Sequence, residues 1–121
     1  MTVLYGIKNC DAVKKARRWL DERGIAYRFH DFRADGLDEK HLARWTKQLG
    51  WENLLNRRGT AWRALPEAER DKVVDAGSAV AAMLARPALI KRPVLESTGA
   101  LRVGYTNGDY DVLLPDVVKK P

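Results

Sequence analysis

The chain has 121 residues, of which 45% are hydrophobic and 31% are charged, a composition typical of one globular domain and not of a disordered chain. Lys and Arg number 22 against 16 Asp and Glu, and the resulting net charge of +6 favours anionic partners without naming one. No run of 18 apolar residues occurs and the start MTVLYGIKNC lacks a signal-peptide pattern, so we expect no membrane span and a cytoplasmic protein.

The first part of the chain predicts a strand, a helix and a second strand. Residues 2–6 form a short apolar run, and residues 25–32 alternate between apolar and polar side chains. Between them, residues 11–23 carry apolar side chains three and four positions apart, and Gly24 stands where a helix C-cap belongs. A strand–helix–strand unit of this length predicts two parallel strands with a right-handed crossover.

The middle of the chain predicts mostly helix. Residues 37–49 have helical periodicity up to Gly50, and residues 51–56 indicate a short helical turn. We expect a basic loop over residues 57–65. Pro66 then begins a helical stretch that continues through residues 78–85 and ends at Arg86-Pro87, and residues 88–93 form a connection.

The last part predicts a β-hairpin and a final helix. Residues 94–97 and 100–103 flank Thr98-Gly99, and Asn107-Gly108-Asp109 precedes a final helix or turn, with a frayed tail from Pro115. The whole order, βαβ, helices, then ββα, predicts a single α/β domain with a mixed sheet and a thioredoxin-like fold. Its core would comprise about residues 1–34 and 86–115, around an inserted helical subdomain at about 37–85.

Cys10 is the main candidate for chemistry. A single cysteine excludes an intramolecular disulfide and a cysteine-rich zinc site, and no metal site is expected. Cys10 directly precedes the first predicted helix, where unpaired amides of residues 11–13 and the positive end of the helix dipole favour a thiolate. Lys8 and Lys14 would support this charge and Asp11 would oppose it. The alternative is that Cys10 is a small buried apolar side chain.

An external thiol would have to complete any redox cycle, because Val13 stands three residues after Cys10 where a second cysteine could be. Glutathione is the simplest candidate. Its carboxylates, or an oxyanion substrate, would need cationic ligands, for which Arg57, Arg58, Arg63 and Arg92 are available; the alternative for each is a solvated surface residue.

The other notable side chains indicate structure more than chemistry. Pro93 precedes a predicted strand, and its peptide bond could be cis or an ordinary trans bond. His30 and His41 lack metal-site spacing, and the four Trp residues suggest packing rather than base stacking, so direct nucleic-acid binding is not expected. No phosphate-binding glycine loop, dinucleotide fingerprint or catalytic-triad signature occurs.

Four motifs in order along the chain resemble the arsenate reductase ArsC / Spx family, most closely its YffB-like branch. The motifs are Tyr5-Gly6-Ile7-Lys8-Asn9-Cys10-Asp11, Val13-Lys14-Lys15-Ala16, Leu54-Leu55-Asn56-Arg57-Arg58-Gly59-Thr60 and Leu89-Ile90-Lys91-Arg92-Pro93-Val94. The resemblance implies a thioredoxin-like fold with a helical insertion. It implies that Cys10 is the family's nucleophile and that Arg92, before a cis Pro93, helps to hold an oxyanion.

The resemblance also implies a function. In arsenate reductases of the family, glutathione and glutaredoxin complete the cycle, whereas YffB-like members are regarded as glutathione-dependent thiol reductases. From it we expect a glutathione-dependent thiol–disulfide oxidoreductase, with Cys10 and Arg92 as catalytic residues. Binding of substrate or glutathione would fall to Lys8, Asn9, Asp11, Ala12, Arg57, Arg58 and Pro93.

Departures from the family pattern bear on the alternatives, which are an arsenate reductase and an Spx-like regulator that binds RNA polymerase. Asn56 stands where an arginine follows the Leu-Leu pair, with Arg57 and Arg58 one and two residues later, and residues 103–105 offer no arginine. Two lost charge-assisted contacts, each worth about 1.5–3 kcal/mol, would weaken arsenate binding by about two orders of magnitude or more. Val13 likewise replaces the second cysteine of a Spx-type switch, which leaves redox-independent polymerase binding open.

Overall fold

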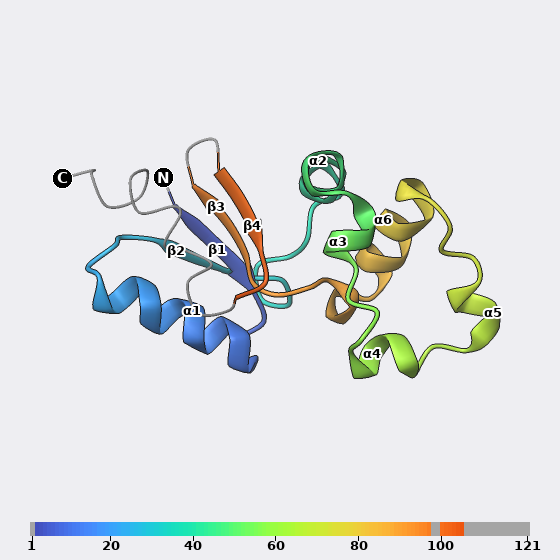
Figure 1. Ribbon diagram of the computed structural model, residues 1–121, viewed down its shortest axis with the longest axis horizontal. Helices are drawn as coiled ribbons and strands as arrows, with labels where there is room; N and C mark the ends of the chain where they lie inside the picture. Colours follow the sequence, from blue (N-terminus) through green and yellow to red (C-terminus); the bar gives the residue numbers. More distant parts are fainter. Residues whose placement is uncertain (1, 98–99, 106–121) are drawn as a thin grey trace. The chain divides into compact units, whose positions relative to one another are not determined.

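The computed structural model describes residues 2–97 and 100–105. The chain divides into two compact units, drawn in Figure 1. Among the described residues, the α/β unit comprises 2–36, 92–97 and 100–105, and the helical unit comprises Leu37–Lys91. Within residues 2–97 and 100–105, none of the helices has both the length and the apolar character of a membrane span.

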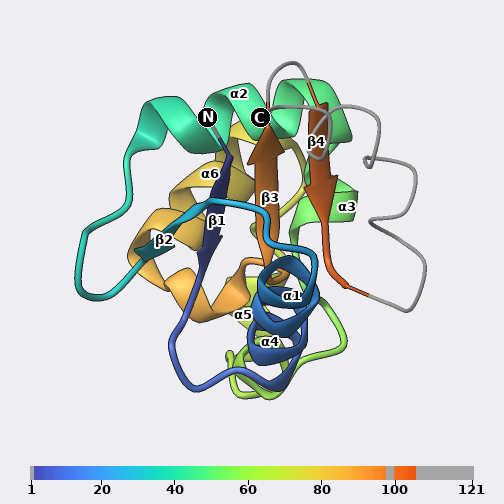
Figure 2. The ribbon, with the colours of Figure 1, turned by 90° about the vertical axis from the view of Figure 1, so that its left-hand side faces the viewer.

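The α/β unit is built on a four-stranded mixed sheet. Its strands are β1 (Val3–Gly6), β2 (Arg28–Asp31), β3 (Val94–Ser97) and β4 (Ala100–Val103), in the order β2-β1-β3-β4 seen in Figure 2. β1 and β2 are parallel, whereas β1 with β3 and β3 with β4 are antiparallel. The sequence-based predictions of a parallel first pair and of a hairpin with these bounds are thereby confirmed, and so is the thioredoxin-like arrangement.

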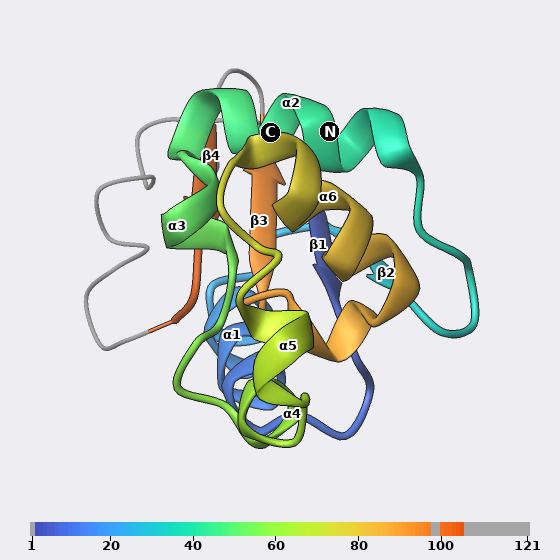
Figure 3. The same cartoon turned by 90° about the vertical axis from the view of Figure 1, so that its right-hand side faces the viewer.

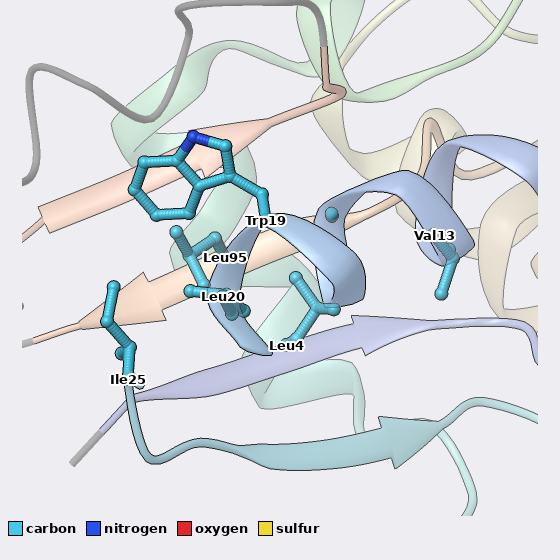
Figure 4. Close-up of a cluster of buried hydrophobic side chains, with 7 residues drawn as sticks. Leu4, Val13, Trp19, Leu20, Ile25 and Leu95 are labelled. Carbon is cyan, nitrogen blue, oxygen red and sulfur yellow. The ribbon is translucent and has the colours of Figure 1, made fainter. Parts of the chain in front are cut away.

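Helix α1 (Asp11–Glu22) buries its apolar stripe against one face of this sheet. Figure 4 shows Trp19 and Leu20 of the helix over Leu4 of β1 and Leu95 of β3. Leu4 and Leu95 are paired in register, so both side chains project from the same face. Burial of a leucine of this kind stabilises the fold by about 1.5–3 kcal/mol, which fixes α1, and with it Cys10, relative to the sheet.

The second strand is shorter than the predicted residues 25–32, because the end of α1 uses the start of that segment. Gly24 has a φ of +65°, its amide donates to Asp21 O at 3.1 Å, and the amide of Ile25 donates to Leu20 O at 3.0 Å. This pair of hydrogen bonds is a Schellman motif, with the apolar Ile25 and Leu20 in one core cluster. Ile25 therefore belongs to the helix end, and the strand begins at Arg28.

The helical unit contains five α-helices and one 3₁₀ helix among its described residues. They are α2 (Glu39–Leu49), α3 (Trp51–Leu54), α4 (Thr60–Arg63), α5 (Glu67–Arg70), α6 (Ala76–Ala85) and η1 (Pro87–Leu89). Helix α2 packs against α3 and α6, as Figure 3 shows, and Trp45, Leu54 and Met83 are fully buried in this unit.

Two predictions for this unit were wrong. The basic segment 57–65 is not all loop, because Thr60–Arg63 forms helix α4 after Gly59. The stretch from Pro66 to residue 85 is two helices, because Asp75 starts α6 with its own cap: its carboxylate accepts from the Ser78 amide at 2.9 Å, and Ser78 Oγ accepts in return from the Asp75 amide at 3.1 Å. Such a capping box fixes a helix start at Asp75 and interrupts the helix before it.

The connection predicted for residues 88–93 is partly ordered by pairing within the helical unit. The amide of Asn56 donates to Leu89 O at 2.8 Å, and the amide of Lys91 donates to Leu54 O at 2.7 Å. These bonds join residues 54–56 to residues 89–91 on either side of an antiparallel bridge between Leu55 and Ile90. The predicted final helix after Asn107 and the tail from Pro115 lie outside the described residues.

Candidate active site

Cys10 is the N-cap residue of α1, as the sequence predicts, and its side chain is half-buried. Its backbone is extended, with φ −108° and ψ 127°, and its carbonyl oxygen accepts the first helical hydrogen bond from the Lys14 amide at 2.9 Å. The sulfur therefore lies at the end of the helix where amides are unpaired and the dipole is positive.

The surroundings of Cys10 lower the pKa of its thiol below the ordinary value. Burial alone raises this pKa, but it is outweighed by the amide of Val13, by the hydrogen bond and positive charge of the Arg92 guanidinium, and by the amide of Ala12. The Cys10 sulfur does not accept a helix-capping hydrogen bond of full geometry. The amides of Ala12 and Val13 therefore act on it chiefly as nearby dipoles. These contacts shift the protonation equilibrium of Cys10 toward the thiolate, which is the nucleophilic form.

Arg92 reaches Cys10 because strand β3 pairs with β1. Arg92 and Pro93 directly precede β3, whose Val94 lies opposite Tyr5 of β1. This places the residues that start β3 beside the segment that leaves β1 for Cys10. The Arg92–Pro93 peptide bond is cis, as the resemblance implies, and the carbonyl oxygen of the buried Pro93 accepts a hydrogen bond from the Gly104 amide at 2.7 Å.

Gly6 allows the first turn of α1 to approach the end of β1. A Cβ atom on Gly6 would lie 2.6 Å from Cγ2 of Val13, closer than carbon atoms approach in proteins. In the sequence, Gly6 is notable only for its place in a motif. A glycine at the end of an apolar strand, directly before a helix start, is the signal that could have indicated a close approach of backbones.

The other predicted residues of the α/β unit surround Cys10 in sequence. Lys8 and Asn9 are exposed in the turn after β1, and Asp11 is exposed in the first turn of α1. Ala12 is half-buried and acts on Cys10 through its amide. Lys8 and Asn9 also line a hollow of about 470 Å³ with residues of α1.

Arg57 and Arg58 belong to the helical unit, on an exposed loop between α3 and α4. The Arg57 guanidinium lies 3.8 Å from a Glu52 carboxylate oxygen and 5.9 Å from the ring centroid of Trp51. Arg58 is held through its backbone, since its amide donates to Asn56 Oδ1 at 3.2 Å and its carbonyl accepts from Arg63 Nη2 at 2.6 Å. Asn56 thus organises the turn that carries both arginines.

Among the described residues, no group of three or more His, Cys, Asp and Glu side chains could hold a metal ion. His30 Nε2 lies 2.8 Å from Gly36 O, and its ring packs against Tyr5 with centroids 5.0 Å apart. His41 stacks on Trp45 within the helical unit. Both histidines therefore have structural contacts of their own.

Comparison with known proteins places these features in a family. The ArsC family matches residues 5–113. An uncharacterized protein of Haemophilus influenzae is 41% identical over 110 residues, which are 91% of this chain and 96% of that protein. The global transcriptional regulator Spx of Listeria innocua is 28% identical over 127 residues, with 98% of this chain and 91% of Spx covered.

Solved structures agree with the sequence relatives. A YFFB protein is 48% identical, with a TM-score of 0.87 over 97% of this chain and 99% of that one. An arsenate reductase (ArsC) related protein from Brucella melitensis is 52% identical, with a TM-score of 0.74 over 92% of each chain. The motifs around Cys10 and Arg92 lie within the matched range, and this chain belongs to the ArsC family.

Proposed function

We propose that this chain is a glutathione-dependent thiol–disulfide oxidoreductase in which Cys10 is the nucleophile. The observation that carries the proposal is the placement of Arg92 beside a half-buried thiol at the N-terminus of α1, where the pKa of Cys10 is lowered. Membership in the ArsC family and likeness to an arsenate reductase-related protein support oxidoreductase chemistry in general terms.

The proposed cycle uses one cysteine and two molecules of glutathione. The Cys10 thiolate attacks one sulfur of a substrate disulfide, forms a mixed disulfide with it and releases the other sulfur as a thiolate. A glutathione thiolate then attacks the Cys10 sulfur and releases the second substrate thiol. A second glutathione attacks the glutathione sulfur of the new mixed disulfide, which regenerates the Cys10 thiolate and yields oxidised glutathione. Two electrons pass from glutathione to the substrate.

Within this cycle Arg92 and the first-turn amides stabilise the thiolate of Cys10 before attack and when it leaves again. A thiolate held in this way is both more abundant at neutral pH and a better leaving group. Lys8 and Asn9 flank the reactive sulfur on the chain and can meet polar groups of the bound thiol. Arg57 and Arg58 remain candidates for a carboxylate of glutathione, with glutaredoxin as a candidate further partner.

The test is the rate of Cys10 alkylation by iodoacetamide as a function of pH, followed by glutathione-dependent reduction of hydroxyethyl disulfide. We expect a midpoint below the value of about 8.5 for a free thiol. Arg92→Gln removes the cation and raises the midpoint, whereas Arg28→Gln, which removes an exposed cation of β2 in the same unit, leaves it unchanged. Full reductase activity in Cys10→Ser, or a midpoint at or above that of a free thiol, would refute the proposal.

Arsenate reduction is the second candidate, favoured by the Brucella melitensis relative. The Asn56 side chain accepts a hydrogen bond from the Arg58 amide and carries no positive charge for an oxyanion. We therefore expect slow turnover of arsenate at best. Arsenate-dependent oxidation of NADPH, coupled through glutathione, glutaredoxin and glutathione reductase, measures it. If the rate at saturating arsenate equals the rate of disulfide reduction, arsenate reduction becomes the favoured function.

A regulator that binds RNA polymerase is the candidate of another class, favoured by the likeness to Spx. Val13 is fully buried where a second cysteine would complete a redox switch, so such binding would be independent of redox state. Capture of polymerase subunits by Cys10→Ala as well as by the unmodified chain would support this candidate. Absence of capture in both redox states would count against it.

A further inference from the structure

The exposed face of α1 carries a cationic hollow, and the proposed chemistry uses none of its lining residues on that helix. It has a volume of about 470 Å³ and is open to solvent. Four of the six side chains that line it are positively charged and one is negatively charged. The lining residues are Lys8, Asn9, Lys14, Arg17, Arg18 and Asp21.

Within residues 2–97 and 100–105, most of this positive charge has no carboxylate partner. Among the described residues, neither Lys8, Lys14 nor Arg18 forms an ion pair with a carboxylate. Arg17 is held in place, because its Nε donates to Tyr27 Oη at 3.1 Å and its guanidinium lies 4.5 Å from the Phe29 ring centroid. The hollow thus combines one fixed guanidinium with three cations that no carboxylate of the described residues pairs, and these can meet an anionic partner.

The hollow includes Lys8 and Asn9, the two residues that precede Cys10 in the chain. Residues three and four apart share one face of a helix, so Lys14, Arg18 and Asp21 continue along α1 from its N-terminus at Cys10. At 1.5 Å per residue the face from Cys10 to Asp21 extends about 16 Å. A partner that lies along it can place one of its own sulfur atoms at Cys10.

The shape and chemistry of the hollow indicate the class of partner. Small ligands are usually enclosed over most of their surface, whereas this hollow is open. None of the described residues that line it is aromatic, so they offer no ring on which bases could stack. Asp21 at its far end opposes a continuous polyanion and suits a polypeptide that carries one base among several acids.

We infer that the hollow is a docking surface for an acidic polypeptide segment of a protein substrate, which presents its disulfide to Cys10. The disulfide exchange rests on the proposed function, but the docking does not. The substrate class is then a protein disulfide flanked by Asp and Glu, and the cations accelerate its encounter with Cys10 by electrostatic steering.

Binding is tested with a fluorescein-labelled peptide that is rich in Glu and Asp and contains no cysteine. The variant Lys14→Glu/Arg18→Glu reverses two cations of the hollow. Lys15→Glu/Arg28→Glu makes the same change in net charge at exposed positions outside it. We expect the first variant to weaken binding at low salt by about tenfold and the second by less than about twofold. Equal weakening in both, or no binding by the unmodified chain, would overturn the inference.

Two further readouts separate the alternatives. A single-stranded oligonucleotide of the same charge replaces the peptide; tighter binding of the oligonucleotide would overturn the assignment to a polypeptide. In the kinetic arm the same peptide carries one cysteine as a mixed disulfide with mercaptoethanol, and dithiodipyridine is the neutral reference. The rate of Cys10 with the peptide disulfide, divided by its rate with dithiodipyridine, should fall about tenfold in Lys14→Glu/Arg18→Glu and in no other variant. A Cys10 inert toward dithiodipyridine would refute the proposed function and leave the binding result standing.

Discussion

Substitution of Gly6 by alanine tests whether the close approach of β1 and α1 is as tight as the structure has it. The added Cβ would lie 2.6 Å from Val13 Cγ2, about 1 Å inside an ordinary carbon–carbon contact. Val13 is fully buried on a helix, where a β-branched side chain has one strongly preferred rotamer, so it cannot swing aside. We expect a loss of about 2 kcal/mol in the free energy of unfolding and a fall of about 8 °C in Tm.

A double-mutant cycle with Val13→Ala isolates this contact. Val13→Ala alone costs about 2 kcal/mol through lost burial, but it removes the methyl group that the Cβ added by Gly6→Ala would strike. The double variant should therefore lose about 1–2 kcal/mol less than the sum of the two single changes. Urea denaturation followed by tryptophan fluorescence measures all four proteins.

Gly77→Ala is the matched control, because a Cβ there would meet nothing closer than 3.8 Å. Gly77 lies in helix α6, where alanine stabilises by about 0.4–1 kcal/mol. Additive costs in the Gly6 and Val13 cycle, or a Gly6→Ala variant as stable as the unmodified chain, would refute the argument from close approach.

Three further outcomes follow from the structure. The pKa of Cys10 is lower in the folded chain than in the unfolded chain, so between these two pKa values the unfolded chain binds more protons. Stability to urea should therefore rise with pH through that interval, up to about 8.5. Cys10→Ser should abolish this rise. Gly24→Ala, at a φ of +65°, should cost about 1 kcal/mol in thermal melting, and a neutral effect would contradict the Schellman geometry. Ser97→Ala should cost about 1–2 kcal/mol by removing the buried partner of Thr2 Oγ1 at 2.9 Å, and Thr2→Val in the same background should cost little more.

Local patterns predicted the parts of the fold that depend on neighbouring residues. The hairpin of β3 and β4 has the predicted bounds, and α1 ends within a residue of its predicted end, because turn residues and helical spacing are encoded locally. The shorter β2 and the break before Asp75 depend instead on hydrogen bonds that compete for the same residues. Alternation alone could not show that Ile25 caps a helix.

The candidate site likewise has features that neighbouring residues predict and features that depend on residues far apart in the sequence. The position of Cys10 at a helix start was predictable from spacing, since strand, loop and helix are consecutive in sequence. That Arg92 lies near Cys10 was predictable only from the resemblance to a family. It depends on pairing between β1 and β3, which the whole helical unit separates along the chain. The contact of Gly6 with Val13 depends on the distance between two backbones, and no periodicity encodes such a distance.

The α/β unit is formed by two chain segments that the helical unit separates, and this order matters during protein synthesis. Leu37–Lys91 is continuous, so the whole helical unit is synthesised before Arg92 and β3. Until β3 pairs with β1, a nascent chain can place the first-turn amides near Cys10 but has no arginine at that position. The contribution of Arg92 to the lowered pKa of Cys10 therefore arises only after β3 has been made and paired, and before that the thiol lacks this contribution.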